Sequence, residues 1–212
     1  MDFALLASLT EDDRRTVLSR AHRRRYATGE VIVHEGDPGE TFHLIAKGRV
    51  GVRVTTPGGS VVLVNVHGPG GAFGEQALID RMALRTATIT ALEPTETLSL
   101  SREAFTALRL EHPGVDRLLV DVLAAEVRRL TVRLAEALYE SAETRVVRRL
   151  LELSAMYDGV VPLTQDSLAS MAGTTRPTTN GVLQGLVADG IVRLGRGRFQ
   201  VIDRAALAAR AR

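Results

Sequence analysis

Beyond residue 101 the spacing of apolar residues changes from strand-like alternation to a helical heptad, and the change separates a mainly β part of the chain from a mainly α part. Up to residue 101, short stretches alternate apolar and polar residues, and glycine clusters separate the first four of them. The stretches are Glu30–Glu35, Thr41–Ala46, Arg49–Thr55, Ser60–Val66, Thr86–Leu92 and Glu96–Ser101. Evenly spaced short strands of this kind predict an antiparallel roll or barrel.

Helices are predicted on both sides of these strands. The segment up to about Ala27 predicts two short helices, with Thr10 as an N-cap. After the last strand, Ser101 predicts the start of a helix that runs to about Glu111.

From Val115 to about Ser141 no proline or glycine interrupts the chain, and the apolar residues fall on a heptad. Successive a and d positions hold Val120, Leu123, Val127, Leu130, Leu134 and Ala137. This pattern predicts the seam of a homodimer. A helix packed against its own roll is the alternative. Both can hold on different faces, because further apolar residues widen the stripe: Leu118, Leu119, Val122 and Leu138.

The C-terminal part predicts three helices, a two-stranded hairpin and a last helix capped by Asp203. The three helices are Arg145–Tyr157, Gln165–Ala172 and Arg176–Ala188, and the strands are Ile191–Leu194 and Phe199–Ile202. This order is typical of a winged helix-turn-helix. The predicted fold is therefore α+β. It has a jelly-roll or cupin-like β-roll over residues 1–114, a dimerisation helix and hinge over 115–142, and a winged helix-turn-helix over 143–212.

Charge and cysteine content narrow the function classes. The 27 Lys+Arg nearly balance the 25 Asp+Glu. From Glu143 to Arg212, however, ten Arg face six acids, so a basic C-terminal domain follows an acidic first part. The chain has no cysteine, which excludes disulfides, thiolate zinc sites and cysteine nucleophiles. No stretch approaches 18 uncharged apolar residues, so we expect a soluble cytoplasmic protein without a membrane partner.

One constellation inside the predicted roll can bind a phosphate. Gly74 allows close approach of the backbone, and a short helix after it would offer free N–H groups to an anion. Arg85 and Thr86 can return a guanidinium and a hydroxyl to the same place. Glu75 can accept hydrogen bonds from ribose hydroxyls, so a sugar phosphate fits better than a bare anion. The alternative is that Glu75 and Arg85 form an ion pair that braces the roll.

A second constellation can bind DNA. Thr164 and Thr175 are predicted N-caps of two helices separated by a turn at Gly173–Thr175. The predicted DNA contacts lie on the second helix, its flanking turn and the wing: Thr164, Thr174, Thr175, Arg176, Thr178, Thr179, Asn180, Gln184 and Arg196. A small three-helix bundle with a solvated face is the alternative.

Together these motifs resemble the bacterial cyclic-AMP receptor protein and fumarate–nitrate reduction regulator (Crp/Fnr) family. The resemblance rests on Thr28–Asp37 (TGEVIVHEGD), on FGE-x-AL followed after six residues by RTAT, and on the long helix and winged domain. It covers nearly the whole chain.

The resemblance implies a cyclic nucleotide effector, cAMP or else cGMP, with no covalent cofactor and no metal. It implies Gly74 and Glu75 at the cyclic phosphate and the ribose 2′-hydroxyl, and Arg85 and Thr86 on the phosphate oxygens. Family hydroxyls that reach the adenine correspond to Leu130 and Thr131, of which only Thr131 retains a hydroxyl. The expected ligand-binding set is Gly74, Glu75, Gln76, Ala77, Arg85, Thr86 and Thr131.

For the DNA, the resemblance implies that Arg176 reads guanine in a palindromic operator. Pro177 and Gly181 replace two other base-reading side chains of the family, so we expect a different operator, with Asn180 as a candidate reader of adenine. The expected partners are duplex DNA, a second copy of the chain and RNA polymerase. Ligand binding is expected to order the long helix and reset a hinge at about Ser141–Thr144.

Three other functions are alternatives for this chain. The chain can be a DNA-binding regulator that is independent of nucleotide or senses another small molecule. A cupin-like metal enzyme would need clustered ligands, whereas the histidines are scattered over positions 22, 34, 43, 67 and 112. A regulatory module of a kinase or channel is disfavoured by the winged domain. We expect a regulator and not an enzyme.

Overall fold

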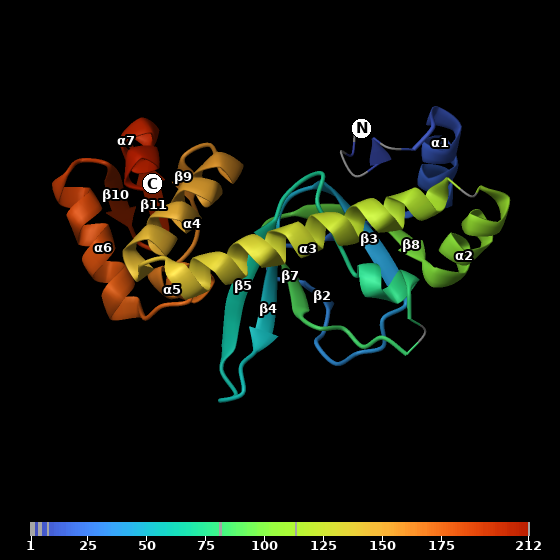
Figure 1. The fold of residues 1–212 in the computed structure, drawn as a ribbon, viewed down its shortest axis with the longest axis horizontal. Coiled ribbons are helices and arrows are strands. Elements are labelled where there is room, and N and C mark those ends of the chain that lie inside the picture. The colour runs from blue at the N-terminus through green and yellow to red at the C-terminus, as the bar shows by residue number, and fades with distance from the viewer. Residues whose placement is uncertain (1–2, 4–5, 8, 81, 113, 212) are drawn as a thin grey trace. The chain divides into compact units, whose positions relative to one another are not determined.

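The computed structural model describes residues 3, 6–7, 9–80, 82–112 and 114–211. The chain divides into two compact units, residues 1–129 and 130–212. The boundary lies inside the long helix α3 (Val115–Tyr139), which is drawn in yellow-green to yellow in Figure 1. The separate segment over 115–142, and with it the three-part division of the chain, stays a prediction.

The described part of the first unit contains two four-stranded antiparallel sheets that form the β-roll. One sheet has the order β1 (His22–Tyr26), β8 (Thr95–Ser101), β3 (Thr41–Lys47) and β6 (Ala72–Phe73). The other has the order β2 (Val31–Val33), β7 (Thr88–Ala91), β4 (Val50–Thr55) and β5 (Val61–His67). All six predicted strands are confirmed. The structure adds a further strand to them, β6, which was not predicted because two residues are too few to show an alternating pattern.

One prediction about the N-terminal segment is wrong. Two short helices are expected up to about Ala27. The one that Thr10 caps is confirmed as α1 (Glu11–Arg20), whereas residues 22–26 form the edge strand β1. Strand β1 pairs with β8, and Arg23 and Arg25 both form ion pairs with Glu96. The residues joined by these two ion pairs are 73 and 71 positions apart in the sequence. Because the partner strand is so distant, no local sequence pattern indicates that residues 22–26 form a strand.

The main core of the roll lies between its first sheet and the helices. Phe42 and Leu100 pack with Phe105 of α2 (Arg102–Glu111) and with Leu118 and Val122 of α3. Each of these side chains is at most 8% exposed. Burying a side chain of this size contributes about 2 kcal/mol relative to leaving it in water. This face of α3 therefore packs against its own roll, as the alternative interpretation of the heptad proposed.

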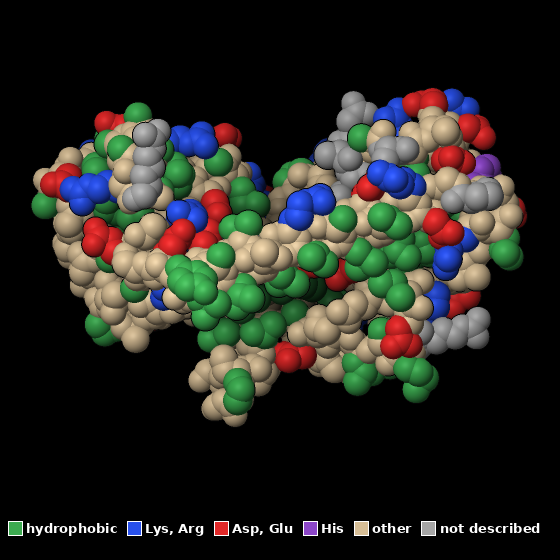
Figure 2. Space-filling view, viewed as in Figure 1, with side chains coloured by type: hydrophobic (Ala, Val, Ile, Leu, Met, Phe, Trp, Pro, Cys, Tyr) green, Lys and Arg blue, Asp and Glu red, His purple; other side chains and the backbone are tan. Residues whose placement is uncertain are grey.

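Another side of α3 carries apolar side chains that the described part of the chain leaves exposed. Val120, Val127, Leu130 and Leu134 are 56%, 62%, 52% and 60% exposed. Figure 2 shows hydrophobic side chains gathered along this helix. Of the two other heptad residues, Leu123 is half-buried and Ala137 is exposed. The two interpretations of the heptad thus use different faces of one helix.

The second unit has the predicted helices and hairpin in the predicted order, and one further short strand, β9, that was not predicted. After α4 (Ala142–Met156) come β9 (Val160–Val161), α5 (Gln165–Met171), α6 (Arg176–Ala188), β10 (Val192–Gly195), β11 (Arg198–Val201) and α7 (Arg204–Arg210). The three strands form one sheet in the order β10–β11–β9. The capping residues explain where the helices begin, because each accepts a hydrogen bond from the N–H three residues later: Ser141, Thr164, Thr175 and Asp203.

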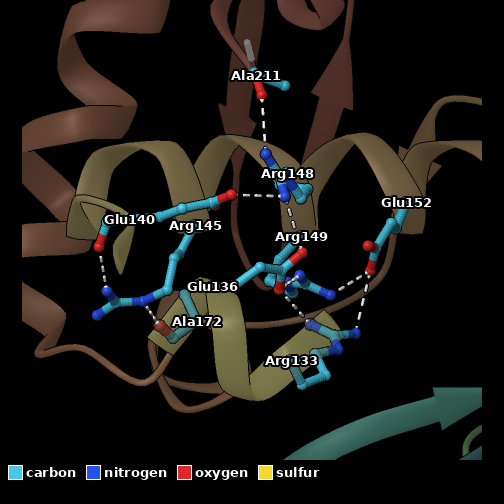
Figure 3. Close-up of polar contacts among 9 residues, drawn as sticks. All are labelled: Arg133, Glu136, Glu140, Arg145, Arg148, Arg149, Glu152, Ala172 and Ala211. Carbon is cyan, nitrogen blue, oxygen red and sulfur yellow. Dashed lines mark hydrogen bonds and ion pairs between the residues drawn. The ribbon is translucent and has the colours of Figure 1, made fainter. Parts of the chain in front are cut away.

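A network of charged side chains joins the end of α3 to α4 within this unit (Figure 3). Glu136 of α3 forms ion pairs with Arg149 and, at 3.0 Å, with Arg148. Arg149 is 1% exposed and also donates to Glu152 at 2.6 Å. Arg133 reaches the same Glu152 at 3.1 Å. A buried charge must be paired to be tolerated, so this network holds α4 against the last turns of α3.

Arg145 extends the polar contacts to the turn before α6. Its guanidinium donates to the carbonyls of Glu140 at 2.7 Å, Ala172 at 2.8 Å and Gly173 at 3.1 Å. A single side chain near the start of α4 therefore ties the end of α3 to the helix-turn-helix. The hinge expected at Ser141–Thr144 lies beside this contact.

Candidate functional site

A cavity of about 740 Å³, including its mouth, lies in the first unit. Its wall includes six of the seven residues expected to bind the ligand: Gly74, Glu75, Gln76, Ala77, Arg85 and Thr86. The fold therefore brings the two ends of the predicted phosphate-binding segment to one place.

Gly74 occupies a position that only glycine can fill. Its φ is +82°, and it precedes the short 3-10 helix η2 (Glu75–Leu78), so the condition set for the anion site, a short helix after Gly74, is met. A Cβ atom at Gly74 would lie 2.5 Å from Nη1 of Arg85 and 2.7 Å from the carbonyl oxygen of Thr41. The first N–H groups of such a turn have no acceptor within it and remain available to a ligand.

Arg85 is held by Thr41. Its side chain donates from Nη1 to the Thr41 carbonyl and from Nη2 to the Thr41 hydroxyl, both at 2.9 Å. Arg85 is 9% exposed. Burial lowers the pKa of Arg85, while the charge of Glu75 acts in the opposite direction. An arginine remains protonated under such conditions, so the cavity wall carries a fixed positive charge.

The alternative interpretation, in which an ion pair between Glu75 and Arg85 braces the roll, does not describe how Arg85 is held. Among the described residues, the hydrogen bonds of the Arg85 guanidinium go to Thr41, and Glu75 forms no ion pair with it. Both side chains instead line the cavity, which leaves the carboxylate of Glu75 available to accept from hydroxyl groups.

Four polar residues of the cavity wall were not anticipated: Asn65 and His67 of β5, and Glu126 and Arg129 of α3. Arg129 donates to both carboxylate oxygens of Glu126, at 2.8 Å and 2.5 Å. The hydrogen bond from Arg129 lowers the pKa of Glu126. Burial lowers the pKa of His67 to about 4, and Arg129 acts in the same direction. The spacing of these residues in the sequence could have indicated that each pair lies on one face of its element. Positions i and i+2 on a strand, and positions i and i+3 on a helix, share a face.

Thr131 is not among the residues that line this cavity. It is exposed on α3, two positions beyond Arg129. Its contact with a nucleobase therefore stays a prediction.

The helix-turn-helix presents most of the predicted DNA contacts to solvent. Arg176, Thr178, Asn180 and Gln184 are exposed on α6, and Arg196 is exposed in the turn between β10 and β11. Thr164 and Thr175 are exposed N-caps, and Thr174 is half-buried.

The prediction that Thr179 contacts DNA is wrong. It is 0% exposed, and its hydroxyl has no hydrogen-bond partner among the described residues. The reason is helical periodicity, because Thr179 shares the inward face of α6 with Leu183 and Leu186, four and seven positions later. Thr179 therefore belongs to the core of the second unit.

Arg176 forms an ion pair with Asp166 of α5 at 3.3 Å. Both side chains are about two-thirds exposed, at 65% and 63%. An exposed pair of this kind contributes at most about 1 kcal/mol, so a DNA phosphate or base can displace Asp166.

Two further features bear on the other function classes. The described residues contain no group of three or more histidine, aspartate or glutamate side chains placed to hold a metal ion. None of the described helices combines the length and the apolar character needed to cross a membrane.

Comparison with known proteins agrees with this arrangement of sites. Residues 23–112 match the cyclic nucleotide-binding domain family, and residues 144–210 match the Crp-like helix-turn-helix domain family. The chain is 37% identical to the cyclic AMP receptor protein of Thermus thermophilus, over 96% of this chain and 94% of that protein. It is 29% identical to a CRP-like cAMP-activated global transcriptional regulator of Mycobacterium tuberculosis, over 88% and 87%.

Solved structures lead to the same group of proteins. The chain resembles the catabolite activator protein of Thermus thermophilus, with a TM-score of 0.57 and 36% identity, over 98% of this chain and 97% of that one. It also resembles a CRP/FNR-family transcriptional regulator from the same organism, with a TM-score of 0.77 and 25% identity, over 90% and 98%.

Proposed function

This chain belongs to the Crp/Fnr family of transcription regulators, and from that premise we propose that cAMP, bound in the cavity of the roll, controls its binding to DNA. The chain is a DNA-binding regulator with a cyclic nucleotide-binding domain, and it is not an enzyme. The observation that carries the proposal is Arg85, a buried cation on the wall of a cavity that also contains Gly74 and Glu75.

The chemistry of the cavity wall fits a cyclic ribose phosphate. Arg85 and Thr86 donate to the phosphate oxygens, and the backbone N–H group of Gln76 lies in the turn that follows Gly74. Ala77 lines the cavity, while its own N–H donates to the carbonyl of Gly74 at 3.1 Å. Glu75 accepts from the ribose 2′-hydroxyl. Two relatives support adenine as the base, since one is named a cyclic AMP receptor protein and the other a cAMP-activated regulator. cGMP is the second candidate for the same cavity.

The exposed apolar side of α3 supports a homodimer. Val120, Val127, Leu130 and Leu134 occupy a and d positions of the heptad and are all more than half exposed in the single chain. Leu123 and Ala137 complete the proposed seam. Pairing of two such helices removes this surface from water and gives the assembly a two-fold axis.

A two-fold dimer reads a palindromic operator when its two α6 helices enter the major groove one turn apart, roughly 34 Å. In this proposal Arg176 contacts guanine, and Asn180 and Gln184 contact adenine or phosphate. Thr164, Thr174, Thr175, Thr178 and Arg196 contact the backbone. The proposal places the chain in the cytoplasm, with RNA polymerase as the further partner of a regulator.

The test is a selection of bound sequences from random duplex DNA with the full chain, run with and without cAMP, combined with titration calorimetry using cAMP and cGMP. We expect a palindromic sequence enriched only with cAMP, and one nucleotide bound per chain. Equal enrichment without nucleotide, with no heat of binding for either compound, would mean a regulator that does not respond to cyclic nucleotides.

A further inference from the structure

The guanidinium of Arg85 is oriented by a residue that lies outside the predicted phosphate-binding segment. Thr41, the first residue of β3, receives hydrogen bonds from Nη1 and Nη2 of Arg85 at 2.9 Å each. These two bonds leave three of the five N–H groups of an arginine for other acceptors. The orientation of the cation at the cavity wall therefore depends on how Thr41 is held.

Thr41 is held in turn by a buried histidine. Nε2 of His43 lies 3.0 Å from the Thr41 hydroxyl, and Nδ1 of His43 lies 3.1 Å from the hydroxyl of Thr97 on β8. The imidazole is 4% exposed and is stacked on Phe73, with 4.7 Å between the ring centroids. Phe73 itself lines the cavity and directly precedes Gly74.

Burial and the neighbouring positive charges keep His43 unprotonated. Burial lowers the pKa of His43 to about 4, and Arg85 and Arg24 act in the same direction. The other groups that contact the ring, Thr41, Thr97 and Phe73, carry no charge. At neutral pH the imidazole is therefore neutral, with one nitrogen that donates and one that accepts.

We assign these hydrogen bonds one direction, which the nitrogen NMR described below tests. The Thr41 oxygen accepts from Arg85, and in this assignment its own proton is donated to Nε2 of His43. This leaves Nδ1 as the protonated nitrogen, which donates to Thr97. The chain of bonds runs from Thr97 through His43 and Thr41 to Arg85.

We propose that His43, in its neutral Nδ1–H form, is a positioning residue for ligand binding: it orients the Thr41 hydroxyl, which orients Arg85 toward the phosphate. The inference rests on the proposed function of the cavity as a nucleotide site. It predicts that breaking this chain of bonds weakens binding of a phosphate-bearing ligand and leaves binding of the uncharged nucleoside unaltered.

The test measures the affinity of the full chain for cAMP by calorimetry and for adenosine by competition with a fluorescent adenosine. Thr41→Val removes the hydroxyl at nearly constant shape, and Thr41→Ser restores it. His43→Phe keeps a ring against Phe73 but removes both nitrogens. We expect Thr41→Val and His43→Phe to weaken cAMP binding by roughly 10-fold, the value of one hydrogen bond to a charged group. Thr41→Ser should recover the wild-type affinity, and adenosine affinity should be the same in all four proteins.

Thr95→Val is the matched control. Thr95 is a buried hydroxyl on β8 that donates to the carbonyls of Arg49 and Glu93 and does not contact Arg85. Thr95→Val removes a buried hydroxyl, as Thr41→Val does, and should leave cAMP affinity unchanged. An independent measurement is the ¹⁵N NMR spectrum of the histidines, in which Nδ1 of His43 should be protonated and Nε2 unprotonated.

Each outcome separates the two hypotheses. Wild-type affinity for cAMP in His43→Phe, equal losses of cAMP and adenosine binding, or a protonated Nε2 would overturn the positioning role of His43. Absence of cAMP and cGMP binding by the wild-type chain, together with the expected NMR spectrum, would instead contradict the proposed function and leave the geometry of the hydrogen bonds intact.

Discussion

Gly74 and Arg85 are in direct contact, because a Cβ atom added to Gly74 would lie 2.5 Å from Nη1 of Arg85. The backbone turn that offers N–H groups and the side chain that offers a cation therefore form one surface. The two residues are eleven positions apart in the sequence.

Gly74→Ala should displace Arg85 and reduce cAMP affinity by at least about 10-fold, because the methyl group needs the space of Nη1. It should also lower the free energy of unfolding by about 1–2 kcal/mol through left-handed backbone strain alone. Gly70→Ala is the matched control, since Gly70 has a φ of +84° and nothing within 4 Å of an added Cβ. That variant should show the strain but retain affinity, as calorimetry and urea unfolding would measure. Equal affinities of the two variants would argue against the contact.

Arg85→Ala should abolish stimulation of DNA binding by cAMP, because the cavity wall loses its fixed cation. Arg85→Lys should give an intermediate response, since an ammonium keeps the charge but cannot donate to Thr41 from two nitrogens. Fluorescence anisotropy of an operator duplex, titrated with and without cAMP, measures both. Unchanged stimulation in Arg85→Ala would show that the cavity is not the effector site.

Arg176→Ala should relax base preference at one operator position by about 1–3 kcal/mol and leave the dimer intact. Thr179→Val is the control, because Thr179 is buried and its hydroxyl has no partner among the described residues. It should keep the full base preference and fold at least as stably as the wild type. Competition binding with single-base operator variants distinguishes the two. Loss of preference in Thr179→Val would restore the residue to the DNA-contacting set.

Glu136→Gln should lower the free energy of unfolding by about 3 kcal/mol, because Arg149 loses a charged partner while it is 1% exposed. Glu140→Gln breaks an ion pair with Arg148 in which both side chains are partly exposed, at 25% and 29%, and should cost less than about 1 kcal/mol. Chemical unfolding of both variants measures the difference. Similar losses in the two would mean that burial of the Glu136–Arg149 pair is energetically unimportant.

His43 should make the protein less stable as the pH falls from 6.5 to about 4. Its pKa is about 4 in the folded chain, against 6.5 for an ordinary histidine. Between these values the unfolded chain binds the proton and the folded chain does not, so stability falls with pH, by on the order of 3 kcal/mol from this residue. Urea unfolding at pH 7 and pH 4 should show a smaller loss in His43→Phe than in the wild type. Parallel losses in both proteins would contradict the buried neutral imidazole.

Much of the candidate site follows from local sequence. The predicted phosphate-binding segment is contiguous from Gly71 to Thr88, so its glycine, carboxylate and arginine could be identified from their spacing. The helix starts were also predictable, because the caps Ser101, Thr164, Thr175 and Asp203 act on N–H groups three residues away.

The errors and omissions concern contacts between distant segments. Strand β1 needs its partner β8 to be a strand at all, and the residues from 22 to 26 show no alternation of apolar residues. Whether Thr179 is exposed or buried depends on which side of α6 faces the core. Helix α6 has few large apolar side chains, so its sequence does not indicate which side that is.

The amino-acid sequence by itself determined the class of fold, the helix boundaries set by caps and the segment that offers a site for phosphate, because these depend on interactions over a few residues. Only the tertiary structure decided that Thr41 holds Arg85, that Asn65, His67, Glu126 and Arg129 share the cavity wall, and which face of α3 is left uncovered. These features arise from strands and helices far apart in the chain, whose side chains meet only when the two sheets and the long helix pack around a common core.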